Sequence, residues 1–415
     1  MARDSLITGL DIGSTAIRIV VGKKEKNSDK LQVIGATEVP AQGISRGVVN
    51  SVEDTVSSIS SALERVERMI GQPVEHAWIG ISGSHIIAQE SRGVVAVSKS
   101  DGEVRNEDVE RAIEAAKAVA IPPNYEILHV IPRSFSVDSQ TSIKDPIGMT
   151  GIRLEVETQI ICGLSAQIKN LTKCIYRTGL DVDDLVLSIL ATSESVLTTR
   201  QKELGVVVVN LGGSTTSITV FEEGDLLHTA VLPVGSSYIT NDIAIGLRIS
   251  IDTAEKIKVR YGNCLPKEFT KSEEIKFSDL GGPEDGDFSP RKVAEIIEAR
   301  VEEILEKVDK ELKRIGKSGM LPAGVVLTGG GANILGIVEM AKTHLRLPAS
   351  LGYSQELISN LDKVSGLNFT TAVGLVLWGS EMESGKGIGA FGLSNFKSID
   401  KAAGKVREWF KSLLP

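Results

Sequence analysis

Hydrophobic and polar residues follow two periods along most of this chain. Short runs rich in valine, isoleucine and leucine, such as Leu6–Leu10, Ile17–Val21 and Val206–Asn210, predict strands. Between such runs, apolar residues recur every three or four positions, and in Ser51–Ile70 they fall on one face of a predicted helix. Because predicted strands and helices alternate, we expect an α/β fold whose sheets are largely parallel.

One stretch, residues 84–157, breaks this alternation. It contains short predicted strands such as Gly93–Val97, a predicted helix over Asn106–Val119, and several prolines. The alternation resumes afterwards with a predicted strand at Gln159–Leu164 and a predicted helix at Ala166–Thr178. We therefore interpret residues 84–157 as a subdomain inserted into a larger α/β body.

A short motif occurs twice, about half a chain apart. Leu10–Thr15 has the sequence Leu-Asp-Ile-Gly-Ser-Thr, and Val209–Thr215 has the sequence Val-Asn-Leu-Gly-Gly-Ser-Thr. Each copy follows an apolar strand and leads into a second one, and Asn210 comes 210 − 11 = 199 residues after Asp11. This spacing predicts a duplicated fold in which each half carries one glycine turn.

Glycine turns of this kind can bind phosphate. Without side chains in the way, consecutive backbone N–H groups can approach phosphate oxygens, and serine and threonine hydroxyls add further donors. Asp11, at the end of the first strand, can hold Mg²⁺ through its waters. A single glycine hairpin is more often purely structural, so the argument depends on the two copies together.

A third glycine motif follows later in the chain. Val325–Asn333 is a predicted buried strand that ends in Gly329, Gly330 and Gly331. Such a segment is either a tight turn between strand and helix or a flat backbone wall against an adenine and its α-phosphate.

Composition narrows the classes of function. The net charge is −8 and the pI about 5.4, which argues against a general nucleic-acid-binding protein. Three widely separated cysteines form no metal-ligand spacing and favour a reducing compartment. The chain opens directly into a strand, so we expect no signal peptide, and no apolar run reaches membrane-spanning length.

The three glycine motifs resemble the phosphate 1, phosphate 2 and adenosine motifs of the superfamily of actin, DnaK-type chaperones and sugar kinases. Within it, the chain is most similar to the FtsA family, which anchors FtsZ filaments to the membrane during bacterial division. The resemblance runs almost end to end. Its most specific segments are Ile131–Phe135, Asp145–Met149, Glu203–Val206, Ala254–Gly262 and Ile296–Ile304.

The resemblance implies an actin-like (ribonuclease H-like) duplicated fold with an inserted 1C subdomain and a C-terminal amphipathic helix. The implied divisions are subdomain 1A (1–83 and 158–204), 1C (84–157), 2A (205–248 and 318–380), 2B (249–317), a flexible linker (381–399) and a membrane-targeting helix (400–415).

The same resemblance implies binding of ATP or ADP with Mg²⁺. On sequence grounds alone, Glu255 and Lys258 are an ordinary helical charge pair; the resemblance places them at the ribose or adenine. The implied nucleotide-binding residues are Asp11, Gly13, Ser14, Thr15, Gly212, Gly213, Ser214, Thr215, Gly235, Glu255, Lys258, Gly329, Gly330, Gly331 and Asn333, with Asp11 also holding the metal through water.

Two positions depart from the superfamily pattern. Asn210 replaces the aspartate that usually begins phosphate 2, and Ser188 aligns with a glutamate that positions the attacking water. Both changes remove a carboxylate, which weakens metal binding and water activation. We therefore assign no catalytic residue and expect a protein that binds ATP but hydrolyses it very slowly or not at all.

The C-terminal segment predicts a surface helix. After the glycine-rich stretch Gly385–Leu393, apolar residues recur at helical spacing with basic residues beside them, a pattern typical of helices that lie in a lipid interface. The alternative is a terminal helix that docks on the protein's own core. The predicted membrane contacts are Lys405, Val406, Arg407, Trp409, Phe410, Lys411, Leu413 and Leu414.

The resemblance also implies partners. These are the C-terminal tail of FtsZ, at subdomain 2B through Arg291, Lys292 and Arg300; other copies of the chain, in filaments; an anionic membrane; and later divisome proteins. The implied location is the cytoplasmic face of the cell membrane at the division site. Two alternatives share the fold: a PilM-like adaptor of pilus assembly, and a kinase, which Asn210 and Ser188 disfavour.

The membrane prediction can be tested with one substitution. Trp409→Glu places a charge in the apolar stripe, so the full-length protein should no longer co-sediment with anionic vesicles. A single short helix binds lipid only marginally, so filaments should bind far better than monomers. Undiminished co-sedimentation of the variant would refute the membrane-binding helix.

Overall fold

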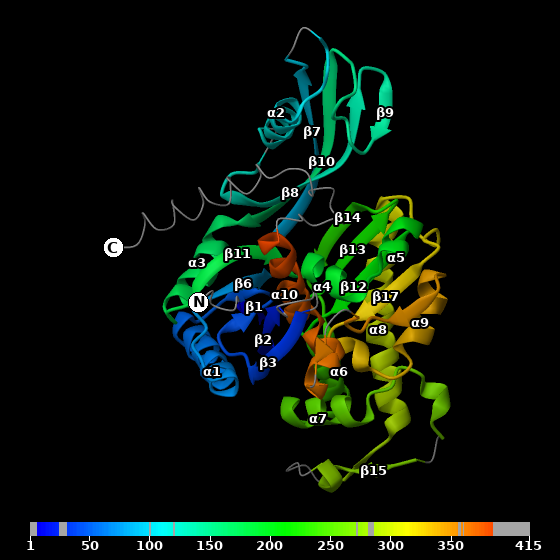
Figure 1. The fold of residues 1–415 in the computed structure, drawn as a ribbon. Coiled ribbons are helices and arrows are strands. Elements are labelled where there is room, and N and C mark those ends of the chain that lie inside the picture. Colours follow the sequence, from blue (N-terminus) through cyan, green and yellow to red (C-terminus); the bar gives the residue numbers. More distant parts are fainter. Residues whose placement is uncertain are drawn as a thin grey trace.

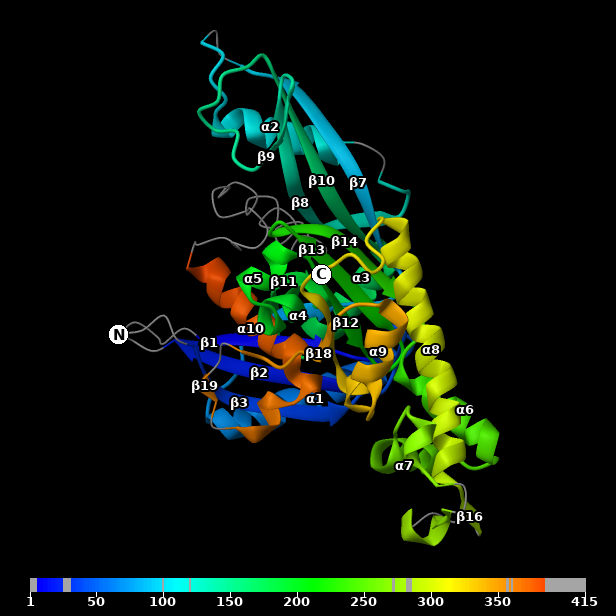
Figure 2. The ribbon, with the colours of Figure 1, turned by 90° about the vertical axis from the view of Figure 1, so that its right-hand side faces the viewer.

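The structure is a computed structural model that describes residues 6–24, 31–98, 101–118, 121–270, 273–280, 286–355, 358–359 and 361–384. Two α/β halves lie side by side, and a smaller domain projects from the first half (Figure 1). A helical layer extends from the far end of the second half (Figure 2). The predicted C-terminal helix and residues 385–399 of the predicted linker lie outside the described residues.

The first half is built on a mixed sheet with the strand order β11-β6-β1-β2-β3-β19. β1 pairs antiparallel with β2 and parallel with β6, so the chain makes a hairpin at residues 13–15 before it crosses back. Helix α1 (Val52–Ile70), capped by Ser51, covers one face with Ile59, Leu63 and Val66. The strands are β1 (Leu6–Ile12), β2 (Ala16–Lys24), β3 (Leu31–Pro40), β6 (His76–Ile81), β11 (Asp181–Leu187) and β19 (Ile358–Ser359); a small hairpin, β4 (Ile44–Ser45) and β5 (Val48–Val49), precedes α1, and α3 (Ser165–Tyr176) precedes β11.

The second half repeats this plan. Its sheet has the order β14-β13-β12-β17-β18, in which β12 pairs antiparallel with β13 and parallel with β17. Asp11 pairs with Arg18 in the first half and Asn210 with Ser217 in the second, so both partners are shifted by 199 residues. The strands are β12 (Val206–Leu211), β13 (Thr216–Glu222), β14 (Asp225–Leu232), β17 (Gly324–Thr328) and β18 (Ala349–Leu351).

The register confirms the predicted duplication and refines it. At a constant shift of 199, Ser14 corresponds to Gly213 and Thr15 to Ser214, so the turns have equal length. The identical Ser-Thr pairs in the two motifs are therefore not structurally equivalent.

The inserted domain has a core of its own. Its sheet has the order β7-β10-β8-β9, and α2 covers one face with Val109 and Ile113 against Phe135 and Leu154. Lys144, in the insert, donates to the carbonyl of Glu223 and pairs with Asp225 at 3.3 Å, so the insert also contacts the second half. The elements are β7 (Ile86–Ala96), α2 (Asn106–Lys117), β8 (Tyr125–Val137), β9 (Gln140–Ile143) and β10 (Arg153–Leu164).

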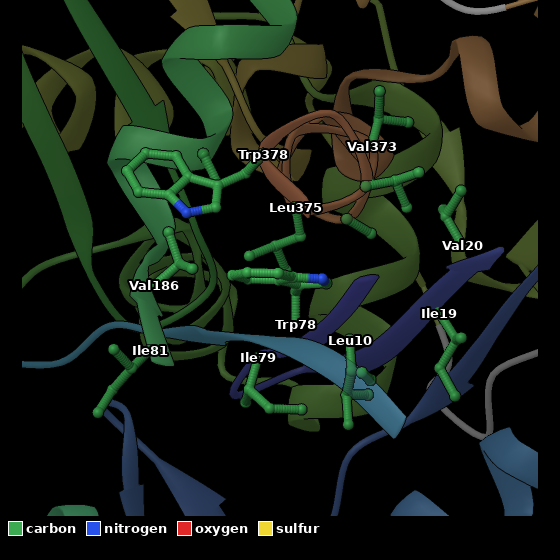
Figure 3. Close-up of a cluster of buried hydrophobic side chains, with 14 of the residues drawn as sticks. Leu10, Ile19, Val20, Trp78, Ile79, Ile81, Val186, Val373, Leu375 and Trp378 are labelled. Atoms are coloured by element: carbon green, nitrogen blue, oxygen red, sulfur yellow. The ribbon is translucent and has the colours of Figure 1, made fainter. Parts of the chain in front are cut away.

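Helices α4 (Ser188–Val196) and α10 (Thr370–Glu383) lie where the two halves meet (Figures 1 and 2). A side chain at Gly374 of α10 would collide with the backbone of Ala191 in α4, so a glycine permits their close crossing. The opposite side of α10 covers the first sheet. There Leu375 points toward Trp78, with Leu10 and Ile79 of the sheet beyond it, as Figure 3 shows.

Helix α6 packs against both α7 and the long helix α8 at the outer end of the second half. Val293, Ile297 and Val301 of α8 are buried in this core. The elements are α5 (Thr199–Leu204), α6 (Ser236–Leu247), α7 (Ile251–Tyr261), β15 (Ile275–Lys276), β16 (Asp287–Phe288), α8 (Pro290–Arg314) and α9 (Ile337–Leu345), with short 3₁₀ turns at Pro266–Glu268, Phe277–Leu280, Gly330–Asn333, Asp362–Ser365 and Leu367–Phe369.

The structure corrects two predicted boundaries. Subdomain 2A was expected to run to residue 380, but β19 pairs with β3 of the first sheet and α10 packs against β1 and β6. β19 joins the first half through its backbone pairing, and α10 joins it because apolar residues of this helix complete the core of that half. The linker was expected from residue 381, yet α10 continues to Glu383. Within the described ranges, no helix has both the length and the apolar content needed to cross a bilayer.

Candidate functional site

The two glycine turns face each other where the halves meet. In the first, the Gly13 N–H donates to the Ala16 carbonyl at 3.1 Å; in the second, the Gly212 N–H donates to the Thr215 carbonyl at 3.0 Å. A Cβ on Gly213 would lie 2.5 Å from the Thr15 methyl carbon, so the second turn reaches the first only because residue 213 has no side chain. The duplicated motifs thus form one site with two walls.

These turns present unused hydrogen-bond donors. Across the part of the chain that the structure describes, the backbone N–H groups of Ser14, Thr15, Gly213 and Ser214 donate to no protein acceptor. Consecutive N–H groups of this kind attract anions, because their partial positive charges point the same way. The site can therefore accept phosphate oxygens from both sides.

The second turn packs against Gly235 and the two residues that follow it. The Ser236 and Ser237 N–H groups donate to the carbonyls of Gly212 and Gly213 at 2.9 and 2.8 Å. A Cβ on Gly235 would lie 2.5 Å from the Gly213 carbonyl oxygen, which only glycine avoids. The predicted site residue Gly235 therefore fixes the turn at the N-terminus of α6.

Asp11 lies at the carboxyl end of β1, in the floor of the site. Arg18 is 3.9 Å from its carboxylate and forms a closer pair with Glu38 at 2.7 Å. Burial raises the pKa of Asp11 to about 6; Arg18 opposes this shift and Glu38 adds to it. Among the described residues, no three histidine, cysteine or acidic side chains gather, so a metal here would need water and phosphate oxygens as further ligands.

Ser188 and Asn210 lie beside this floor. A Cβ on Gly80 would meet the Ser188 hydroxyl at 3.0 Å and an Asp11 carboxylate oxygen at 3.6 Å, so the two side chains flank one point of β6. Asn210 occupies the place in β12 that Asp11 has in β1, and its side-chain amide donates to Thr192 and Thr371. Neither residue supplies a carboxylate.

The third glycine motif forms a wall at the carboxyl end of β17. Gly329 has φ +84° and touches Asn210 and Leu211, and Gly331 packs on Leu211. Gly330, by contrast, faces open space, and its carbonyl accepts a hydrogen bond from the Asn333 amide at 3.0 Å. Gly329 and Gly331 are therefore packed against β12, while the backbone of Gly330 between them is exposed.

Glu255, which is exposed, and Lys258, which is half-buried, connect α7 to α6. Lys258 pairs with Glu255 at 2.6 Å and donates to Thr240 at 2.8 Å, while Thr240 donates to Glu255 at 2.5 Å. Lys258 also reaches the Ser236 carbonyl at 3.4 Å, at the start of α6. The pair is thus more than the surface charge pair that spacing alone suggested, and it adjoins the segment that supports the second turn.

Contacts across the two halves include residues that the sequence did not reveal. Arg46, in the small hairpin, donates across the halves to the Tyr238 hydroxyl of α6 at 2.9 Å. Within the first half, the neighbouring Gly47 N–H donates to the Ser14 hydroxyl at 3.3 Å and so ties this hairpin to the first glycine turn. Ser82 and Ser217 join the ends of β6 and β13 at 3.2 Å. No motif marks these residues, because pairing between distant segments leaves no local pattern.

Comparison with known proteins identifies the family. The family described as "Cell division protein FtsA" matches residues 207–374, and that described as "SHS2 domain inserted in FTSA" matches residues 83–162. The chain is 39% identical to the cell division protein FtsA of Pseudomonas aeruginosa over 91% of this chain and 90% of that protein. The chain belongs to the FtsA family of cell division proteins. The FtsA of Bacillus subtilis is 40% identical over 83% of this chain and 78% of its own length.

Solved structures show that this FtsA-family chain has the actin-like fold. A chain of the PilM-PilN type IV pilus biogenesis complex matches with a TM-score of 0.66 at 16% identity, over 90% of this chain and 98% of that one. MreB5 of Spiroplasma citri bound to ADP matches with a TM-score of 0.50 at 12% identity, over 91% and 95%. The AMPPNP-bound form gives 0.51 at 11% identity, over 96% and 98%.

The predicted partner residues of this FtsA-family chain differ in their surroundings. Arg291 and Lys292 lie in the first turn of α8, where Lys292 is exposed and Arg291 pairs with Glu295 at 3.3 Å. Arg300 donates to both carboxylate oxygens of Asp242 in α6, at 2.6 and 2.9 Å, and lies over the Tyr238 ring. Arg300 therefore joins α8 to α6.

The raised pKa of Asp11 predicts a pH-dependent stability difference. The folded carboxyl titrates near pH 6 and the unfolded one near 3.8, so folding binds a proton between these values and its free energy becomes less favourable as pH rises. Asp11→Asn removes this cost. Without nucleotide, the variant should be more stable than the wild type by about 1–3 kcal/mol at pH 8, and the advantage should vanish by about pH 4.

Thermal unfolding between pH 4 and 8 would measure this difference. Asp287→Asn, at an exposed position, is the matched control for the loss of one negative charge. An Asp11→Asn variant that is less stable at every pH would show that the ion pair with Arg18 outweighs burial.

Proposed function

We propose that this chain binds ATP or ADP between its two halves and uses the bound nucleotide as a structural clamp. The observation that carries the proposal is the pair of facing turns whose N–H groups at Ser14, Thr15, Gly213 and Ser214 have no protein acceptor among the described residues. MreB5 of Spiroplasma citri, which shares the fold, has been solved bound to ADP and to AMPPNP, and this supports the nucleotide assignment.

Each wall has a separate task in this proposal. The two turns hold the phosphates through backbone donors, and the exposed surface of Gly330 lies against the adenine and α-phosphate. Asp11 orients Mg²⁺ through water, and the Glu255–Lys258 pair lies toward the ribose. Because both halves contact one ligand, bound nucleotide fixes the angle between them.

Hydrolysis is slow in this proposal. An attacking water needs an acceptor for its proton and a precise position, and a carboxylate supplies both. By the resemblance, Asn210 and Ser188 align with two positions where superfamily enzymes carry acids, and the Asn210 amide is already bonded to threonine hydroxyls. Binding without rapid turnover suits a switch for assembly better than it suits a kinase.

The cellular role follows from family membership. We propose that the chain forms filaments on the cytoplasmic face of the cell membrane at the division site, links FtsZ to that membrane, and recruits later divisome proteins through the inserted domain. The sequence relatives are FtsA proteins over most of the chain, which favours this role over that of a PilM-like adaptor.

Nucleotide binding can be tested at Gly330. A Cβ there meets no neighbour within 4 Å, so Gly330→Val should leave the fold intact while placing two methyl groups against the proposed nucleotide. Wild-type protein with Mg-ATP at about 100 times its Kd should gain roughly 2.7 kcal/mol in stability. The variant should lose most of that gain at unchanged stability without nucleotide.

Calorimetric titration with Mg-ATP and Mg-ADP would give the affinities. Met320→Val is the control, because Met320 is exposed and precedes the start of β17, whereas Gly330 follows its end. Equal affinity in wild type and Gly330→Val would refute the assignment of this wall, and rapid turnover abolished by Asp11→Ala would refute the clamp.

Partner binding can be tested on α8. Arg291→Glu with Lys292→Glu should weaken binding of the FtsZ C-terminal peptide by at least about tenfold, because acidic residues of the peptide would meet like charge. Lys307→Glu with Lys310→Glu, further along the same helix, changes the net charge equally and should have little effect. Similar losses in both pairs would indicate a general charge effect and contradict the assigned surface.

A further inference from the structure

The side chain of Asn210 ends in a buried group of hydroxyls. Its amide nitrogen lies 3.3 Å from the Thr192 hydroxyl of α4 and 3.2 Å from the Thr371 hydroxyl of α10. The two hydroxyls are 2.9 Å apart, and both threonines are buried. Three segments, β12, α4 and α10, therefore meet at these side chains, which we call the Asn210 clasp: Asn210, Thr192 and Thr371.

The two threonine hydroxyls of the clasp have two protons, and both are used in other hydrogen bonds. The side chain at position 210 therefore fits best as a hydrogen-bond donor to these hydroxyls. The Thr192 hydroxyl donates to the Ser188 carbonyl at 2.8 Å, one turn earlier in α4. Its oxygen is then free to accept from Thr371, whose single proton is used in that contact. Both hydroxyl oxygens can still accept, and the amide of Asn210 supplies the donor.

An aspartate would not satisfy this arrangement. A carboxylate has no proton to give, so three oxygen atoms would share the two hydroxyl protons, one of which already goes to Ser188. At least one existing hydrogen bond would break, and the carboxylate would face a hydroxyl oxygen with no proton between them. On the other side of Asn210, its carbonyl oxygen lies against Gly329, which leaves little space for rearrangement.

We infer that Asn210 is a positioning residue whose amide fixes the carboxyl end of β12 to both helices that lie between the halves. Gly212 and Gly213 follow this residue directly, so the clasp sets where the second glycine turn stands relative to the first. Asparagine at this position therefore has a structural task that aspartate cannot perform. The effect on nucleotide depends on the proposed function, but the clasp itself does not.

Nearby contacts extend the same connection. Thr328, the β17 partner of Asn210, joins Thr370 of α10 through hydroxyls 3.0 Å apart. The Ser195 hydroxyl of α4 donates to the Thr370 carbonyl at 2.8 Å. Two neighbouring strands of the second sheet, β12 and β17, are thus hydrogen-bonded to α10, and β12 makes this bond through Asn210.

A double-mutant cycle tests the clasp without nucleotide. Asn210→Ala and Thr371→Val should each lower the Tm by about 2–4 °C, and the double variant should lose little more than the larger single loss. Ser91→Ala, which removes a buried hydrogen bond inside the inserted domain, should combine additively with Asn210→Ala. Additive losses for Asn210 and Thr371 would overturn the inference.

The Asn210→Asp variant distinguishes two roles for residue 210: positioning the second glycine turn, or standing where a catalytic aspartate would activate water. If the clasp positions the turn, the variant should have a lower Tm, weaker Mg-ATP binding and no gain in ATP turnover per bound nucleotide. A tenfold rise in turnover at unchanged Tm would overturn the inference and assign residue 210 to water activation. If the wild type binds no nucleotide, the proposed function fails, while the Tm cycle still decides the clasp.

Discussion

The close crossing of α4 and α10 is the constraint on which the rest of the molecule depends. At Gly374 the two helices approach until the backbone of one meets the other, with no space for a side chain. The opposite side of α10 completes the apolar core of the first sheet, while threonines at its start bond to strands of the second. One helix thus serves both halves, so the positions of the two glycine turns are determined together.

Electrostatics divides the site into unequal parts. In the first half a carboxylate, Asp11, is held where burial disfavours its charge, so that charge is available to compensate a cation. In the second half the equivalent position carries a neutral amide that is already hydrogen-bonded. The two halves therefore share one backbone plan but carry different side chains at the equivalent strand ends, a carboxylate at Asp11 and an amide at Asn210.

Much of this arrangement follows from local sequence. The two glycine motifs, their spacing and the strands around them were predictable because backbone turns need glycine and buried strands need apolar residues. The packing of α10 on the first sheet could not be predicted, because the apolar pattern of a helix does not indicate which sheet the helix will cover. The prediction that Arg300 binds a partner stays a prediction, but its bond to Asp242, 58 residues away, could not be foreseen because charge spacing reveals only nearby pairs. The resemblance placed Asn210 at the site, and only the neighbouring threonines explain its amide.

The inserted domain is held by both halves of the molecule. It grows covalently from the first half, and Lys144 at its far side is ion-paired to Asp225 of the second half. An object fixed to one body and tethered to another must tilt, or release its tether, whenever the angle between those bodies changes. The position of the insert therefore depends on the angle between the two halves, although the glycine turns that join them lie elsewhere in the molecule.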